Sequence, residues 1–134
     1  MRALLRVVIT LPRALDADLQ TAQRLSLNEY STMMRLSETP ERRLSMSALA
    51  DAAALSLSGM TRIVSRLEED GLVRRDRSPG DGRVLDATLT PAGLRRLEKA
   101  WPAHVESIRH HVLDHLEGVD LDTFTKVFSA IAND

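Results

Sequence analysis

The chain has 134 residues, a formal net charge of -1 at pH 7 and no cysteine. The length suits one domain with a substantial core, and the lack of thiols excludes a disulfide framework, a thiolate zinc site and a thiol-based redox sensor. The apolar patch near the N-terminus is short and ends at Pro12 and Arg13, so neither a signal peptide nor a membrane span is expected, and the cytoplasm is the expected compartment.

Two helices are expected before Pro40. Apolar side chains recur at intervals of three and four: Leu4, Val8, Leu11, Leu15 and Leu19. This spacing predicts a helix over residues 2–22 with one apolar stripe. Because Pro12 lies inside it, the helix is either kinked there or begins later, with the proline in its first turn. A second helix is expected over residues 27–37, and Pro40 is its stop.

Two short helices and a hairpin come next. Ser47 is the expected cap of the helix "SALADAAA", the following "LSLS" is read as a turn, and Ser58 is the expected cap of a helix that Gly71 closes. Residues 71–90, "GLVRRDRSPGDGRVLDATLT", hold two imperfectly alternating arms around a turn-forming centre, which is typical of an antiparallel hairpin. Two short helices joined by a tight turn and followed by a hairpin predict a winged helix-turn-helix.

The C-terminal third is predicted to be helical. Thr90 and Pro91 form an expected N-cap and first turn for a helix over residues 91–116, which Pro102 is expected to bend, and a final helix follows. A helix of this length would span ~39 Å, further than so small a globule covers. Its apolar stripe therefore predicts a homodimer in which the first and last helices take part. The alternative is a monomer whose three terminal helices pack together.

The fourth helix, over residues 58–70, has a polar face suited to DNA. Its members are Thr61, Arg62, Ser65, Arg66 and Glu69. Arg62 and Arg66 lie one turn apart and can reach one major groove, where arginine grips guanine O6 and N7 with two hydrogen bonds. The alternative is an ordinary solvated face carrying ion pairs. The adjoining hairpin favours the DNA-reading interpretation.

The hairpin concentrates arginine in a chain that is slightly negative overall. The arginines are Arg74, Arg75, Arg77 and Arg83. The glycine-containing tip can approach a sugar-phosphate backbone closely, and Arg83 beside it could enter the minor groove. Asp81 is expected to accept hydrogen bonds from an arginine of the helix and hairpin, with Arg62 as the first candidate. The alternative is a turn residue satisfied by its own backbone.

Residues 25–116 resemble the MarR family, the multiple-antibiotic-resistance type of bacterial regulators. Three motifs carry the resemblance: "LSLSGMTR", "LEEDGLVRR", and Asp81-x-Arg83 before "LTPAG". The resemblance places Arg83 in the minor groove and ties Asp81 to an arginine of the recognition helix. Gly82 stands where many members have another arginine, which implies a missing wing contact. The predicted DNA-binding residues are Ser58, Thr61, Arg62, Ser65, Arg66, Arg77, Asp81 and Arg83.

The resemblance implies a mainly α fold with a small β-hairpin wing, in one MarR-like domain over residues 1–134. Residues 24–90 would form the DNA-binding lobe, and residues 1–23 with 91–134 the dimerisation helices. It also implies a transcriptional regulator, by analogy a repressor, that binds a pseudo-palindromic operator on double-stranded DNA as a homodimer. A small aromatic or lipophilic effector, bound in a cleft of the protein, would release the regulator from DNA. The candidate residues that line this cleft are Tyr30, Met33, Met34, Arg35 and Trp101. The alternative for these side chains is the core.

Other functions find less support in the sequence. His104, His111 and His115 share a helix face, and the last two have the spacing of a metal-binding pair, but further ligands would have to come from Glu29 or Asp18 across a dimer. Packing or hydrogen bonding is the expected role of these histidines, and no metal or cofactor is predicted. No phosphate-binding glycine loop or activated nucleophile points to an enzyme. A winged helix used for protein contact, without specific DNA binding, remains the rival interpretation, with a metal-responsive regulator as a second.

Overall fold

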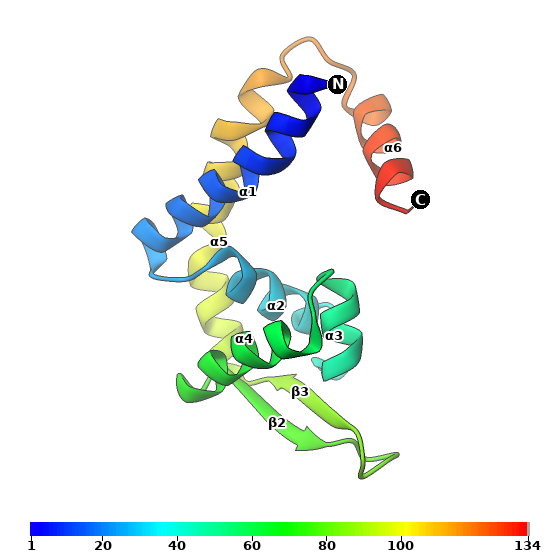
Figure 1. Cartoon of the computed structure of the whole chain (residues 1–134). Helices are drawn as coiled ribbons and strands as arrows, with labels where there is room; N and C mark the ends of the chain where they lie inside the picture. The colour runs from blue at the N-terminus through cyan, green and yellow to red at the C-terminus, as the bar shows by residue number, and fades with distance from the viewer. Residues whose placement is uncertain (134) are drawn as a thin grey trace.

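The computed structural model describes residues 1–133, which form six α-helices, one 3-10 turn and a three-stranded sheet (Figure 1). In chain order these are α1 (Arg2–Gln23), α2 (Leu27–Ser37), β1 (Arg43–Ser45), α3 (Met46–Ala52), α4 (Leu57–Glu69), β2 (Val73–Arg77), β3 (Leu85–Leu89), α5 (Pro91–His111), the 3-10 turn Leu113–His115 and α6 (Leu121–Ala132). Helices α2 to α4 and the sheet form a head, from which α1 and α5 extend side by side (Figure 1). The predicted mainly α fold with a small β wing is confirmed.

The sheet holds one strand that the sequence did not reveal. Strands β2 and β3 form the predicted hairpin, and β1 pairs with the other edge of β3, so the strand order is β1-β3-β2 with antiparallel pairing throughout. Leu44 of β1 lies opposite Ala87 of β3. Three residues are too few to show an alternating pattern, so only the pairing defines this strand.

Hydroxyl caps set where the helices of the head begin. The Oγ atoms of Ser45 and Ser56 each accept the backbone N–H three residues ahead, at 3.1 Å in both cases. The predicted caps Ser47 and Ser58 are therefore wrong by two residues, because each of these serines follows another at a spacing of two and both can cap equally well on sequence grounds. The predicted cap Thr90 is confirmed at the start of α5.

Two helix boundaries also differ from expectation. Helix α1 begins at Arg2 and continues through Pro12, so the later start is wrong. Helix α5 ends at His111 rather than near Leu116, because Val112 leaves the helical region at φ -127° and ψ -63°. None of the described helices is both long enough and apolar enough to cross a membrane.

The core joins the head to α5. Its fully buried members include Tyr30, Met33 and Leu36 of α2, Leu49 of α3, Met60, Val64 and Leu67 of α4, Val73 and Ala87 of the sheet, and Ala100 of α5. Since α2 packs against both α4 and α5, any movement of α5 relative to the head acts on the helix that supports α4.

Helices α1 and α6 leave much apolar surface exposed. Helix α6 lies apart from the head, and all of its residues except Phe124 are exposed (Figure 1). The exposed apolar side chains of the two helices are Leu4, Leu5, Val7, Val8, Ile9, Leu121, Val127, Phe128 and Ile131. Large exposed apolar side chains gathered on two helices are typical of an interaction surface.

Helix α5 meets the hairpin at Gly93. A Cβ atom at this position would lie 2.1 Å from the Leu72 carbonyl oxygen and 2.6 Å from Leu89 Cδ1. Only glycine allows the first turn of α5 to approach the backbone before β2 so closely. The direction in which α5 leaves the head is therefore fixed by backbone contact.

The variant Gly93→Ala should lower the free energy of unfolding by about 1–3 kcal/mol, since the added methyl must displace backbone and overpack the core. Urea unfolding followed by circular dichroism measures the change. Gly80→Ala is the matched control because a Cβ there meets no atom within 4 Å. Equal stability of the two variants would contradict the close packing at Gly93.

Candidate nucleic-acid interface

Helix α4 presents its polar face to solvent. Met60, Val64 and Leu67 are buried, and the predicted reading residues lie on the other side, with Ser58, Arg62 and Arg66 exposed and Thr61 and Ser65 half-buried. The helical period alone produces this division once the apolar side is buried. The structure therefore brings the predicted α4 residues together on one accessible surface.

The wing, residues 73–89, stands beside this surface. A groove of about 310 Å³ separates it from the start of α4, and Thr61 lines one wall while Arg83 lines the other. Arg83 is almost fully exposed, at 96% of its side-chain surface. Thus the reading helix and the tip of the wing face the same side of the molecule, as two neighbouring grooves of DNA require.

Two of the four wing arginines donate side-chain hydrogen bonds to carboxylates of the chain itself. Arg74 donates from Nε to Asp76 Oδ2 at 2.6 Å, and Arg75 Nη2 lies 2.9 Å from Glu68 Oε1. Arg77 donates to the carbonyl of Gly82 and so closes the tip. The clustering of arginine in the hairpin therefore has two causes, since Arg74 and Arg75 hold the wing together and Arg83 remains available to a partner.

Asp81 contacts Arg83 and not Arg62. Its Oδ1 accepts the backbone N–H of Arg83 at 3.0 Å and lies 3.9 Å from the Nε of the same residue. The predicted hydrogen bond from Arg62 is therefore wrong for this structure, because the carboxylate is satisfied within its own turn. Within residues 1–133, the side chain of Arg62 makes no hydrogen bond or ion pair.

Glu68 joins the wing to the end of α4, a role that the sequence analysis missed. Its Oε2 accepts the backbone N–H of Arg75 at 3.1 Å, and its Oε1 accepts from the guanidinium. The hydrogen bond from the Arg75 side chain is the main cause that lowers the pKa of Glu68 below its ordinary 4.5. The sequence could have indicated this pair, because Glu68 and Arg75 lie on either side of the Gly71 turn and carry opposite charges. This pair links the end of α4 to the start of the wing and so restrains the angle between them.

A second missed residue, Arg43, ties β1 to the hairpin. Its Nε donates to Thr88 Oγ1 at 3.0 Å, and its Nη2 donates to Asp76 Oδ2 at 3.3 Å. The buried carboxylate of Asp86 lies 3.7 Å from the same Nε. Nothing in the local sequence pairs Arg43 with a strand that lies more than thirty residues later, so only the sheet reveals this contact.

Two of the three histidines of the C-terminal helical segment pack or hydrogen-bond within the chain. His104 is buried against the ring of Tyr30, with ring centroids 4.4 Å apart, and burial lowers its pKa. His111 Nε2 lies 2.9 Å from Asp18 Oδ2, which also accepts from Ser107 Oγ at 2.6 Å. No group of three metal-ligating side chains occurs among the residues that the structure describes. Asp18 instead links α1 to α5 within one chain.

The residues proposed for an effector are partly brought together. Tyr30, Met34 and Trp101 line a cleft of about 520 Å³ between α2 and α5. The Tyr30 hydroxyl is buried, which raises its pKa, and it has no hydrogen-bond partner within residues 1–133. Met33, which is fully buried in the core, and Arg35 do not line this cleft.

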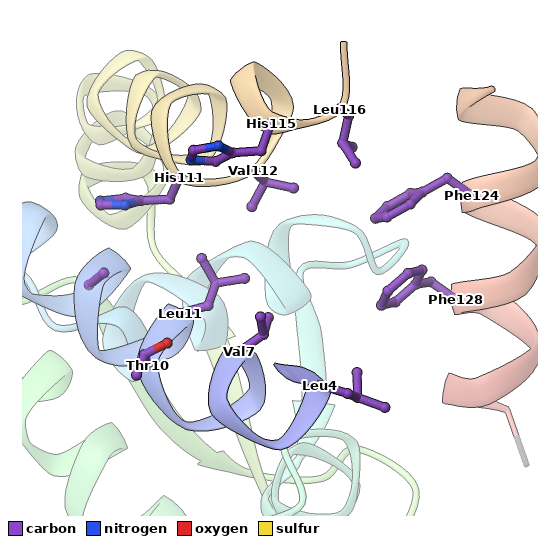
Figure 2. A pocket seen from close by; sticks show the side chains of 11 residues that line it. Leu4, Val7, Thr10, Leu11, His111, Val112, His115, Leu116, Phe124 and Phe128 are labelled. Atoms are coloured by element: carbon purple, nitrogen blue, oxygen red, sulfur yellow. The ribbon is translucent and has the colours of Figure 1, made fainter. Parts of the chain in front are cut away.

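A second cleft, of about 480 Å³, lies between α1, the end of α5 and α6 (Figure 2). Phe124 and Phe128 stack at a centroid distance of 4.3 Å and point from α6 toward the other two helices. Its lining is mostly apolar, with His111 and His115 at one side. The cleft is continuous with the exposed apolar surface of α1.

Known proteins share this architecture. The family model described as MarR family matches residues 25–85. The HTH-type transcriptional repressor Rv2887 of Mycobacterium tuberculosis is 33% identical over 110 residues, which cover 82% of this chain and 77% of that protein. AbsC, a MarR family transcriptional regulator from Streptomyces coelicolor, has a TM-score of 0.86 and 38% identity over 98% of this chain and 88% of that one. The chain belongs to the MarR family.

A further MarR-family structure was determined with DNA bound. Sco3205, a transcriptional regulator from Streptomyces coelicolor in complex with DNA, has a TM-score of 0.88 and 32% identity, covering 98% of this chain and 82% of that one. The chain is accordingly a MarR-family transcriptional regulator, and the prediction that it is not an enzyme is confirmed. The residues that contact DNA remain predictions.

The variant Glu68→Gln should destabilise this MarR-family protein at about pH 7 by at most about 1 kcal/mol, since the pair with Arg75 is partly exposed. Because folding lowers the pKa of Glu68, its stabilisation is complete above 4.5 and is lost as the pH falls through the folded value. The difference between wild type and variant in urea unfolding should therefore shrink on acidification. A difference that stays constant down to pH 3 would contradict the pairing.

Proposed function

We propose that this regulator binds a pseudo-palindromic operator as a homodimer and acts as a repressor in the cytoplasm. In each protomer, α4 enters the major groove and the wing reaches the adjacent minor groove. The observation that carries the proposal is the groove with Thr61 on one wall and Arg83 on the other, since it gives helix and wing a common DNA-facing side. Repression is supported by a relative, Rv2887, that is named a repressor.

The two DNA-facing elements would divide the work between them. Arg62 and Arg66 suit guanine edges, and the hydroxyls of Ser58, Thr61 and Ser65 suit bases or phosphates. In the wing, Arg83 suits the negative potential of the minor groove. Asp81 and Arg77 brace the tip, since each hydrogen-bonds within it. These roles assign a function to all eight predicted DNA-binding residues.

The dimer would form through the ends of the chain. The apolar surfaces of α1 and α6 and the cleft in Figure 2 are suited to a second copy of the same surface. Residues 1–23 with 91–134 would then be dimerisation helices, and residues 24–90 the DNA-binding lobe. A two-fold axis places two reading helices roughly 34 Å apart, on successive turns of one face of the duplex.

An effector would act through the cleft between α2 and α5. Tyr30, Met34 and Trp101 line this cleft with apolar and aromatic groups. Such an effector would be a small aromatic or lipophilic ligand. It would bind more tightly to a dimer whose two α4 helices are wrongly spaced for DNA than to a dimer in which they are correctly spaced. The difference between these two affinities sets how much the ligand weakens DNA binding. The cleft lies where α2 contacts α5, so a ligand there is placed to change that spacing.

The rival function, a winged helix that contacts protein, is separated from DNA binding by Arg83. The variant Arg83→Ala should weaken binding to operator DNA by at least about tenfold and reduce the salt dependence, because a minor-groove cation is lost. Fluorescence anisotropy at two salt concentrations measures both, with an operator obtained by selection from random-sequence duplexes.

Arg13→Ala is the matched control for this measurement. Arg13 is exposed on α1, away from the groove, and its loss removes the same charge. Operator affinity should stay within about twofold of wild type, since only the general electrostatic attraction is changed. Equal behaviour of the two variants would remove Arg83 from the interface and favour the protein-contact interpretation.

The dimer is tested by Phe128→Glu. Wild type should sediment as a dimer at micromolar concentration, and the variant should shift to monomer because a buried, unpaired carboxylate opposes association. Lys126→Glu, on the same helix and also exposed, is the charge-changing control and should remain dimeric. A wild-type protein that sediments as a monomer would contradict the proposed assembly.

A further inference from the structure

The carboxylate of Glu29 is fixed at the start of α2. Its Oε2 accepts the backbone N–H of Ser26 at 3.0 Å, and Ser26 Oγ accepts the backbone N–H of Glu29 at 3.0 Å. This reciprocal capping box holds the side chain in one position. Only 14% of the Glu29 side-chain surface is exposed, so little water competes for its remaining lone pairs.

The other oxygen of Glu29 faces the reading helix. Glu29 Oε1 lies 3.7 Å from the Nε of Arg66, whose side chain is otherwise 73% exposed. Within residues 1–133 the terminal nitrogens Nη1 and Nη2 of Arg66 make no hydrogen bond, and the side chain is largely exposed. Arg62 lies one turn earlier on α4, and its side chain forms no ion pair with a carboxylate of residues 1–133. The two arginines of the reading face are therefore differently constrained.

A carboxylate beside Nε restricts how a planar guanidinium can turn. When Nε faces Glu29, the edge formed by Nη1 and Nη2 is left for a partner, and this edge can donate two parallel hydrogen bonds to guanine O6 and N7. Orienting the side chain before binding also reduces the entropy lost on binding. The capping box explains why the Glu29 side chain is held in place. Because its other oxygen, Oε1, lies beside Arg66 Nε, the same carboxylate also restricts the orientation of the Arg66 guanidinium.

We propose that Glu29 is a positioning residue for operator recognition, which orients Arg66 so that its two terminal nitrogens read one base pair in each half-site. The inference rests on the proposed function and extends it to a residue of α2 that makes no DNA contact itself. Arg62, which lacks such a support, would contribute more to general affinity than to base selection.

The variant Glu29→Gln separates positioning from capping and from charge. Glutamine can complete the same capping box, so the fold should be kept. Removal of a negative charge near DNA should by itself strengthen binding to every sequence. Loss of an oriented Arg66 should instead weaken binding to the operator alone. The two effects have opposite signs for operator DNA, so one titration distinguishes them.

The experiment starts with an operator selected by wild-type protein from random-sequence duplexes. Anisotropy titrations of this operator and of a scrambled duplex then compare wild type with Glu29→Gln, Arg66→Ala and the double variant. We expect Glu29→Gln to weaken operator binding about tenfold, at the lower end of the value of one guanine contact, with scrambled binding unchanged or tighter. The double variant should bind the operator no more weakly than Arg66→Ala does, because the glutamate supports operator binding through that arginine.

A repeated selection with the single variants tests the role directly. Glu29→Gln and Arg66→Lys should lose preference at the same base pair, since lysine keeps the charge and lacks the planar fork. Glu41→Gln is the matched control, because Glu41 is exposed in the turn before β1, outside the polar face of α4, and forms no ion pair within residues 1–133. Its ratio of operator to scrambled affinity should stay within about twofold of wild type.

The outcomes separate this inference from the proposed function. An unchanged selected sequence for Glu29→Gln, a change at a different base pair from Arg66→Lys, or additive losses in the double variant would overturn the positioning role and leave DNA recognition intact. If wild type itself selects no sequence, the proposed function fails and the inference falls with it. Circular dichroism of Glu29→Gln establishes that the variant is folded in each comparison.

Discussion

The burial of one face of α4 against α2 and the sheet is the constraint on which the rest of the structure depends. Met60, Val64 and Leu67 are buried in the core, and once they are fixed the helical period leaves the polar side chains no direction but outward. The same core includes Tyr30 and Met33 of α2. The reading surface is thus positioned by the packing behind it, and α2 supports both that surface and α5.

Internal pairing of charge explains how a slightly negative protein can present a basic edge. Glu68, Asp76 and Asp86 lie against arginines of the sheet and the wing, so these carboxylates add rigidity without facing a partner. Arg62 is left without a carboxylate among the residues described, and Arg83 has only the Asp81 of its own turn. The net charge adds up all charged residues of the chain. Association with DNA depends instead on which charged side chains are exposed together on one surface.

Helix α5 contacts other elements along its whole length. At its start, Gly93 allows backbone contact with the hairpin, and in its middle, His104 packs on Tyr30. Toward its end, Ser107 and His111 hydrogen-bond to Asp18 of α1. Helix α5 therefore contacts the hairpin, α2 and α1 along its length.

The fold and the polar, exposed face of α4 could be predicted from the MarR-family motifs and the amphipathic spacing, because both are local properties of the sequence. The caps Ser45 and Ser56 were missed in favour of serines two residues later, since local sequence alone permits either choice. The short strand β1 was missed because three residues carry no periodicity. For Asp81 the structure shows the alternative that the sequence left open, since the carboxylate accepts the backbone N–H of Arg83 in its own turn and no hydrogen bond from Arg62.

Sequence by itself determined the helical periodicity, the hairpin with its arginines, the absence of thiol chemistry and the family motifs, all of which depend on residue type and short spacing. Tertiary structure alone decided which arginines are paired and which are exposed, that Met33 lies in the core while Tyr30 also lines a cleft, and that Glu29 faces Arg66. Those outcomes depend on contacts between residues far apart in the chain, whose distances follow from packing and not from sequence separation.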